Sequence, residues 1–351
     1  MNKNYCLLST ASAALLLLAS CGGGSQTESG ADASASVDSS KVIGYSMLSS
    51  ANPFFKVISR SMTEEAAKHG YTVVAVSGDL DLEKQRQQVD DFIARKVAAI
   101  VLNPCDSKGI GPVIEKANEA GIPVFTCDIK SLASTGKVVA HIATDNFAGG
   151  RLAGEAMIEA LSGNGGKIAI IDYKDAESCL LRVAGFKEVI EQHNAQNPGA
   201  KFEIVRELGG EGDLEKGRTA AQDIVQAVPD IDGIFAINDP SGLGAWSALD
   251  TAGKAESVVL IGFDGQPDGK KAVQAGKFYA SPIQFPSMMG KQTIDTIVKY
   301  FNGEAVESEQ LISPMIYKQE DANNDPDIDS WGFLQNSAEQ GEIALVHGAF
   351  R

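Results

Sequence analysis

Residues 41–55 read KVIGYSMLSSANPFF, and this stretch contains the strand-to-helix junction that decides the fold. Residues 41–46 are apolar enough to predict a buried strand, and the apolar spacing that follows predicts an amphipathic helix over 53–69. Asn52 is suited to cap that helix, and Pro53 fits its first turn, where a missing N–H costs nothing. The junction therefore lies at the carboxyl end of a strand, which is where open α/β sheets bind ligands.

The side chains at this junction favour one kind of ligand. Phe54 and Phe55 offer flat apolar faces, and the amide of Asn52 both donates and accepts hydrogen bonds in one plane. A sugar ring, with its C–H faces and its rim of hydroxyls, suits that combination. On this stretch alone the alternative stays open that both rings are ordinary core residues of the helix.

Strands and helices alternate along the rest of the chain. Further strands are expected over 71–76, 98–102, 123–128, 138–144, 167–171, 202–208, 233–237, 258–263 and 280–285. Helices are expected over 82–95, 110–120, 146–161, 178–193, 214–227 and 241–251. Regular alternation with short loops indicates crossover units and parallel sheet. Because there are about twice as many units as one doubly wound domain uses, the sequence predicts an α/β protein of two similar Rossmann-like lobes.

Polar residues recur directly after the predicted strands. They are Asn52, Asn103, Asp128, Asp145, Asn238 and Asp264. Because the carboxyl ends of parallel strands meet at one edge of a sheet, two facing lobes would bring several of these side chains into one cleft.

The amino terminus is expected to be a targeting segment. The apolar run from Ala13 to Ala19 is too short to span a bilayer and is typical of a secretory signal, residues 1–20. Leu18-Ala19-Ser20-Cys21 resembles the lipobox of bacterial lipoproteins, which predicts a lipidated, for example palmitoylated, Cys21. A plain signal peptide with an incidental cysteine is the alternative. Residues 21–40 lack apolar periodicity and predict a flexible linker to a membrane anchor.

Composition excludes several classes of partner. The chain has 351 residues, enough for two domains, and a formal net charge of −16. Nucleic acids and anionic lipids both reward a basic surface, so neither is an expected partner.

The sequence predicts no metal and no cofactor. Cys105, Cys127 and Cys179 have no zinc-type spacing, and whether Cys105 pairs with Cys127 stays open. The Gly-rich run 163–167 lacks the spacing of a phosphate-binding loop, and residues 321–332 lack the glycine and glutamate of a calcium loop.

Several runs, in this order and at these spacings, resemble one protein family over nearly everything after Lys41. The runs are Asn52-Pro53-Phe54-Phe55, Asn103-Pro104-Cys105-Asp106-Ser107, His141-Ile142-Ala143-Thr144-Asp145-Asn146, Asn238-Asp239, Gly262-Phe263-Asp264-Gly265 and Pro267-Asp268-Gly269. The family is that of the periplasmic sugar-binding proteins of bacterial ABC importers, in the group with the ribose- and fructose-binding proteins. The resemblance implies the type I periplasmic binding protein fold, two lobes joined by a three-stranded hinge.

The resemblance also implies how the chain divides. The amino-terminal lobe is expected over 41–144 plus about 285–313. The carboxyl-terminal lobe is expected over 145–284 plus about 314–335, and a tail over 336–351.

The resemblance further implies a set of ligand-binding residues drawn from both lobes. They are Asn52, Phe54, Phe55, Asp128, Thr144, Arg182, Asn238, Phe263, Asp264 and Gln284. In such a site carboxylates only accept, a guanidinium only donates and amides do both, so a ring of hydroxyls can be fully satisfied. No catalytic residue is implied.

Two departures from the ribose-binding pattern concern the size and polarity of the site. Ile129 stands where those proteins have a second arginine, and Gly212 stands where they have a phenylalanine. Glu211-Gly212-Asp213 and Asn238-Asp239-Pro240 look more like the fructose-binding branch. The sequence therefore favours a roomier monosaccharide site, with ribose kept as possible.

Taken together, the sequence predicts an extracytoplasmic solute-binding lipoprotein, not an enzyme. It is expected to capture a fructose-like or ribose-like monosaccharide and to deliver it, by hinge closure, to the permease subunits of an ABC importer. We expect a monomer held by its lipid in the periplasm or at the cell surface. The alternatives are a chemotaxis or sensing receptor, a transcription regulator, which would need a DNA-binding domain before Lys41, and a carbohydrate-acting enzyme.

Overall fold

The computed structural model describes residues 38–329 and 331. The predicted signal peptide, the linker before residue 38, Cys21 and the tail over 336–351 lie outside these described residues. Within the described part, every helix is too short or too polar to cross a membrane.

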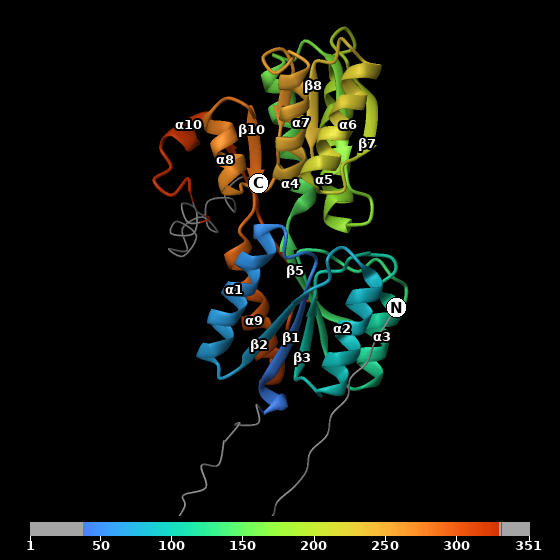
Figure 1. Ribbon diagram of the computed structural model, residues 1–351, viewed down its shortest axis with the longest axis vertical. Helices are drawn as coiled ribbons and strands as arrows, with labels where there is room; N and C mark the ends of the chain where they lie inside the picture. The colour runs from blue at the N-terminus through green and yellow to red at the C-terminus, as the bar shows by residue number, and fades with distance from the viewer. Residues whose placement is uncertain (1–37, 330, 332–351) are drawn as a thin grey trace, which may run out of the picture. The chain divides into compact units, whose positions relative to one another are not determined.

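The first lobe is built on a six-stranded sheet (Figure 1). Its strands, in spatial order, are β11 (Glu309–Ile312), β5 (Val138–Thr144), β4 (Val124–Cys127), β3 (Ala99–Leu102), β1 (Val42–Met47) and β2 (Thr72–Ser77). All neighbouring pairs are parallel. A short 3-10 turn, η1 (Ser39–Lys41), leads into β1. The helices of this lobe are α1 (Pro53–Lys68), α2 (Leu82–Ala94), α3 (Gly111–Glu119) and α9 (Pro286–Phe301).

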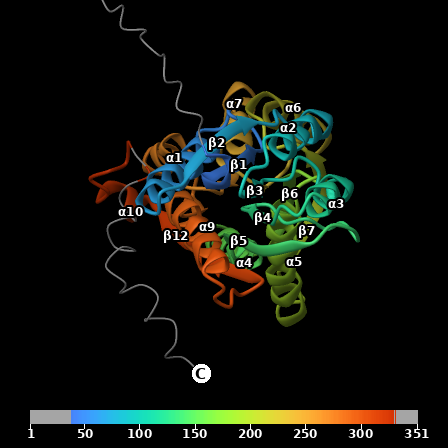
Figure 2. The ribbon, with the colours of Figure 1, turned by 90° about the horizontal axis from the view of Figure 1, so that it is seen from below.

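Helices cover both faces of this sheet because successive residues of β1 point to opposite sides. Ile43 and Tyr45 belong to the core cluster that includes α1 and α9, whereas Val42 belongs to the cluster formed with α2 and α3. Figures 1 and 2 show α1 and α9 on one side of the sheet and α2 and α3 on the other. The continuous apolar run of β3 is explained in the same way, because a strand covered on both faces has no polar side.

The second lobe repeats this plan. Its strands, in spatial order, are β12 (Met315–Lys318), β10 (Ala280–Ile283), β9 (Val259–Ile261), β8 (Gly233–Ala236), β6 (Gly166–Asp172) and β7 (Phe202–Gly209). Its helices are α4 (Asn146–Ala160), α5 (Glu177–Gln196), α6 (Leu214–Ala227), α7 (Asp239–Thr251), α8 (Pro267–Gln274) and α10 (Gln319–Asn323). The one antiparallel pair in this sheet is β12 with β10. The predicted fold class, an α/β protein of two doubly wound lobes, is confirmed.

The chain passes between the lobes at three places. It leaves the first sheet after Thr144 to begin α4, returns after Ile283 to begin α9, and leaves again between Ile312 and Met315. Strand β10 was expected to extend to Phe285. It ends at Ile283 because the next residues make the second passage and Pro286 opens α9.

Several elements had no counterpart in the sequence prediction. They are α8, α9, β11, β12 and α10. The last two strands are only four residues long and mix polar with apolar residues, so their periodicity gives almost no signal. The question of a disulfide is answered as well, because Cys105, Cys127 and Cys179 are all free and buried.

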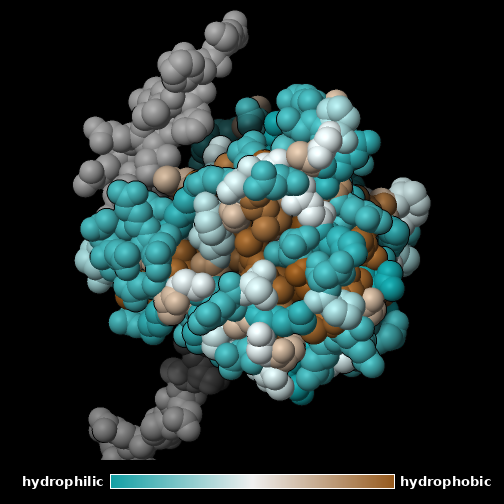
Figure 3. Space-filling view, turned by 90° about the horizontal axis from the view of Figure 1, so that it is seen from above, coloured by the Kyte–Doolittle hydropathy of each residue, from teal (hydrophilic) through white to brown (hydrophobic). Residues whose placement is uncertain are grey.

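Figure 3 shows a largely hydrophilic face, seen from above the view of Figure 1, on which apolar residues are visible mainly near the centre.

Candidate functional site

A cavity of about 340 Å³ is lined by residues of both lobes at the carboxyl ends of their strands. The predicted site residues that line it are Asn52, Phe54, Phe55, Asp128, Arg182, Asn238, Asp264 and Gln284. Eight of the ten predicted positions, far apart in the sequence, are thus brought together around one space.

The first lobe supplies an amide and two rings from the start of α1. The Oδ1 atom of Asn52 accepts a hydrogen bond from the Phe54 N–H at 2.9 Å, so Asn52 caps the helix as expected. The rings of Phe54 and Phe55 meet edge to face, with centroids 5.2 Å apart. Both rings are buried and also line the cavity, so the core and the cavity-wall interpretations both hold.

Trp331 extends this aromatic group. Its ring centroid lies 5.8 Å from that of Phe54, also edge to face. Sequence reasoning assigned no role to Trp331 and placed residues 314–335 with the other lobe.

Asp128 is a buried carboxylate whose Oδ1 atom has no hydrogen-bond partner. Burial raises the pKa of Asp128 to about 7; the positive charge of Arg182 opposes this rise and the negative charge of Asp264 adds to it. Its φ of 63° is unusual for a residue other than glycine. An unpaired acceptor held in a strained backbone conformation is a feature found at binding sites.

Arg182 lies on α5, where that helix passes very close to α4. A Cβ atom at Gly150 would lie 2.0 Å from the Arg182 carbonyl oxygen, so only glycine permits this approach. The Nε atom of Arg182 donates to Asn146 Oδ1 at 2.8 Å. Its Nη1 atom donates to the Ile237 carbonyl at 2.7 Å and to Asp264 Oδ1 at 3.2 Å. The guanidinium is therefore fixed on three sides before any ligand arrives.

Phe263 lies beneath this guanidinium and does not line the cavity. The Arg182 Cζ atom lies 3.9 Å from its ring centroid, an arrangement that favours a cation. The ring is fully buried, and a Cβ at Gly149 would be 2.5 Å from it. The structure therefore places Phe263 as a support for Arg182.

Asp264 and Gln284 complete the second-lobe side of the cavity. Gln284 Nε2 donates to Asp264 Oδ1 at 2.7 Å, which leaves Gln284 Oε1 buried without a partner. Gln266 Nε2 donates to the other carboxylate oxygen, Oδ2, at 3.1 Å. Burial raises the pKa of Asp264, and the positive charge of Arg182 opposes that rise.

Three polar residues expected near the cleft do not line the cavity. Thr144, at the end of β5, is buried with its Oγ1 atom unpartnered. Asp145 caps α4 by accepting from the Ala148 N–H. Asn103 points into the first lobe, where it accepts from the Tyr45 hydroxyl and donates to the Cys127 carbonyl.

Other lining residues were missed by sequence reasoning. Gln266 contacts both Asn52 and Asp264, and Tyr173 lies 4.0 Å from the position that a Cβ at Gly212 would take. The only available signal was position, because Tyr173 follows β6 just as other site residues follow their strands. Ile129 is buried and lines the cavity.

The balance of charges around the cavity limits what it can hold. Five carboxylates line it against one guanidinium, which disfavours an anionic ligand. Unpartnered buried acceptors disfavour a purely apolar one. The arrangement suits a neutral molecule with several hydroxyl groups.

One group among the described residues has the composition of a metal site. Ligand atoms of Glu65 on α1, His69 at the C-cap of α1 and Asp295 on α9 lie within 4.8 Å of one another. However, Lys68 and Lys291 each lie 2.8 Å from one of the two carboxylates. Ion pairing therefore accounts for the cluster, and none of its three residues lines the cavity between the lobes.

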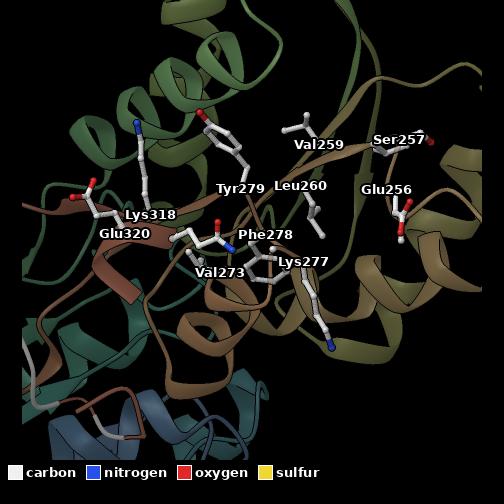
Figure 4. Close-up of a pocket in the computed structure, with 14 residues that line it drawn as sticks. Glu256, Ser257, Val259, Leu260, Val273, Lys277, Phe278, Tyr279, Lys318 and Glu320 are labelled. Atoms are coloured by element: carbon white, nitrogen blue, oxygen red, sulfur yellow. The ribbon is translucent and has the colours of Figure 1, made fainter. Parts of the chain in front are cut away.

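A second hollow, of about 480 Å³, lies at the amino ends of β9 and β10 (Figure 4). Its lining comes from the second lobe alone and includes no unpartnered buried polar atom among the described residues. Lys318 and Tyr279 both donate to Glu159, and Lys277 lies over the ring of Trp246. Because these polar groups are already paired, the larger hollow gives weaker evidence of a ligand than the cavity between the lobes.

Comparison with known proteins agrees with this geometry. The family model of the periplasmic binding protein domain matches residues 43–305, which include every predicted ligand-binding residue. The chain belongs to the periplasmic binding protein family. The predicted resemblance to sugar-binding proteins of ABC importers is confirmed, and so is the prediction that the protein is not an enzyme. Membership of this family also implies a location outside the cytoplasm.

Two curated members of the family illustrate the similarity. The chain is 35% identical over 270 residues to the ribose import binding protein RbsB of Escherichia coli (strain K12), covering 76% of this chain and 88% of that protein. It is 30% identical over 249 residues to a D-apiose import binding protein of Paraburkholderia graminis, covering 71% and 77% respectively.

Solved structures of the family have the same fold. A solute-binding protein of Bacillus halodurans C-125 with bound myo-inositol is 28% identical with a TM-score of 0.72, covering 82% of this chain and 98% of that one. One from Actinobacillus succinogenes 130z with bound D-allose is 27% identical with a TM-score of 0.73, covering 81% and 99%.

Proposed function

We propose that the protein captures one neutral monosaccharide between its lobes and delivers it to the permease of an ABC importer. The observation that carries this proposal is the pair of buried, unpartnered acceptors in the cavity, Asp128 Oδ1 from the first lobe and Gln284 Oε1 from the second. Burying an acceptor without a donor is costly, so a ligand must bring donors to both lobes at once. Sugar hydroxyls do this.

The ligand-binding set comprises the eight predicted residues that line the cavity, and Phe263 acts through Arg182. Asn52 and Arg182 donate to the sugar, Asp128, Asp264 and Gln284 accept from it, and Phe54 and Phe55 cover its C–H faces. A fructose-like sugar is favoured and a ribose-like one is kept as possible, because Ile129 and Gly212 remove an arginine and a ring from the ribose-binding pattern. Relatives named for ribose and D-apiose, and structures with D-allose and myo-inositol, define the compounds to test.

Closure is of the hinge type. Ligand contacts with both lobes stabilise the shut form, which the permease recognises. The amino-terminal lobe comprises 41–144 with 285–313, and the other comprises 145–284 with 314–335. Membership of β11 in one sheet and β12 in the other supports this division.

Calorimetric titration with D-ribose, D-fructose, D-allose, D-apiose, L-arabinose and myo-inositol tests the proposal. We expect a dissociation constant of about 1 µM or lower for at least one of these sugars, because a fully enclosed sugar satisfies every buried group. Only millimolar or absent binding to all of them would contradict the proposal. Recovering the sugar unaltered after prolonged incubation separates binding from catalysis.

Lipid attachment at Cys21 anchors the protein, as a monomer, at the periplasmic or outer face of a membrane. Support comes from the lipobox alone, since Cys21 lies outside the described residues. The Cys21→Ser variant is expected to appear in the soluble fraction and to lose incorporation of labelled palmitate. Incorporation that persists in this variant would rule out Cys21 as the attachment site.

A further inference from the structure

We infer that Gln266 is a positioning residue that holds the two lobes together across the cavity before a sugar enters. It acts through Asn52 and Asp264 and thereby sets the affinity of the site. This inference rests on the proposed function, but its structural part can be tested without any sugar.

In this contact one amide nitrogen, Nε2 of Gln266, donates a hydrogen bond to an acceptor in each lobe. Gln266 Nε2 lies 3.3 Å from Asn52 Oδ1 in the first lobe and 3.1 Å from Asp264 Oδ2 in the second. The Asn52 atom must be its oxygen, because it also accepts the Phe54 N–H. Since both partners are acceptors, the Gln266 atom that faces them must be the nitrogen, with one proton for each lobe.

The backbone of Gln266 is fixed, so the side chain is well placed for this contact. Its N–H donates to Asp239 Oδ2 at 2.8 Å, and Asp239 Oδ1 accepts from the Ser281 hydroxyl at 3.1 Å. Asp239 is fully buried, and a Cβ at Gly269 would lie 2.0 Å from it. The turn from Asp264 to Gln266 is therefore tied to the core of the second lobe.

The same contact orients the amide of Asn52. Its oxygen accepts both the helix-capping hydrogen bond and that of Gln266, so its Nδ2 atom is the group left to face a sugar. Asn52 is thereby committed to donating. This complements the acceptors of Asp128 and Gln284, so loss of Gln266 should weaken binding as well as closure.

A second cross-lobe contact limits how far the lobes would open without Gln266. The Ser107 N–H donates to the Asp175 carbonyl at 3.0 Å, and the Ser107 hydroxyl accepts from the Glu177 N–H at 3.0 Å. These bonds do not involve Gln266. We therefore expect a shift in the population of closed molecules of about tenfold, the effect of one or two hydrogen bonds.

The test compares the full-length protein with the variants Gln266→Glu and Gln266→Leu by small-angle X-ray scattering without sugar. Gln266→Glu places a carboxylate against two acceptors, and Gln266→Leu removes the donor at similar volume. Both variants are expected to have a larger radius of gyration than the wild type. Gln274→Glu is the matched control, because Gln274 lies on the adjoining helix α8 and donates to Ala322 of its own lobe.

Titration with D-ribose and D-fructose gives the second readout. For whichever of these sugars binds the wild type, the two Gln266 variants should bind about tenfold more weakly and Gln274→Glu equally well. A radius of gyration in both folded Gln266 variants equal to that of the wild type would overturn the inference. If no sugar binds the wild type, the proposed function fails, and the sugar-free scattering still decides whether Gln266 holds the lobes together.

Discussion

Asp128 and Asp264 occupy equivalent places in the two lobes but have opposite surroundings. Each follows the third strand in the order of its sheet, β4 or β9, and each has a positive φ, 63° and 116° respectively. Asp264 is hydrogen-bonded by Arg182, Gln266 and Gln284, whereas Asp128 Oδ1 has no partner. The equivalent backbone position thus carries a carboxylate with several hydrogen-bond donors in the second lobe and a carboxylate with an unpartnered oxygen in the first.

The difference extends to the cores behind these residues. Behind the cavity in the first lobe lies a neutral network, in which Asn103 links the Tyr45 hydroxyl to the Cys127 carbonyl. The second lobe buries charged groups, including the Arg182–Asp264 pair and the pair formed by Lys270 and Asp325 at 2.7 Å. We conclude that the charged groups of the second lobe are already paired with one another before a ligand binds. The first lobe instead supplies an acceptor, Asp128, that gains its hydrogen-bond donor from the ligand.

Removing the central cation should have the largest effect. Arg182→Met leaves Asp264 and Asp128 buried without a positive charge, so the free energy of unfolding is expected to fall by about 3–5 kcal/mol and sugar binding to be lost. Chemical denaturation and calorimetry measure the two effects. The control is Arg151→Met, since the Arg151–Glu188 pair also joins α4 to α5 but is 38% and 37% exposed, and should cost less than about 1 kcal/mol. Equal costs for the two variants would contradict the prediction.

Replacing Asp128, the carboxylate with an unpartnered oxygen, should raise the stability of the protein at pH 8 but weaken sugar binding. The pKa of Asp128 is raised from 3.8 to about 7, so the folded state binds its proton more tightly than the unfolded state does. The resulting stability is fully present below about pH 4 and is lost as the pH rises to about 7. Asp128→Asn removes this loss, so the variant should be more stable than the wild type at pH 8, by roughly 1–3 kcal/mol.

The same variant should bind sugar at least about tenfold more weakly, because a charged acceptor is replaced by a neutral one. Unfolding free energies measured between pH 4 and 8, with titration at pH 8, check both effects. Asp264→Asn provides the contrast, because it removes the carboxylate that accepts a hydrogen bond from Arg182 and should destabilise the protein at pH 8. A gain in stability from Asp264→Asn would show that the two carboxylates are alike after all.

Changing the aromatic wall of the first lobe should have a moderate effect on binding. Phe55→Leu keeps an apolar side chain but removes the flat face, so sugar affinity should fall about fivefold, with less than about 1.5 kcal/mol lost in stability. Phe125→Leu is the matched control, because Phe125 is fully buried in the same lobe and does not line the cavity. If both variants bound sugar equally well, Phe55 would be a core residue only.

Substitution in the neutral network around Asn103 should have the smallest effect on stability and no effect on sugar binding. Tyr45→Phe removes one hydroxyl that donates to Asn103, and should cost about 0.5–1.5 kcal/mol with unchanged sugar affinity. Tyr317→Phe, which removes the hydroxyl donor to Asp325 in the second lobe at 2.8 Å, should cost more because its acceptor is charged. Thermal unfolding of both variants tests this order, and the reverse order would remove the distinction between the two cores.

The sequence determined the two-lobed α/β plan and most of the site. Alternation of strand and helix, the cap at Asn52 and the polar residues after each strand are local features, and parallel topology brings strand ends together whatever the details. This is why Asp128, Asn238 and Asp264 were placed around one cavity, whereas Arg182, which lies within a helix, was assigned to it only through the family resemblance.

Tertiary structure alone decided the contacts between distant residues. Gln266 reaches Asn52 across 214 positions of sequence, Phe263 turns beneath Arg182, and Asn103 turns inward to Tyr45. The short strands β11 and β12 exist because an edge of each sheet was available to pair with them. No local pattern encodes these outcomes, because the partner that fixes each side chain or strand is supplied by a remote part of the chain.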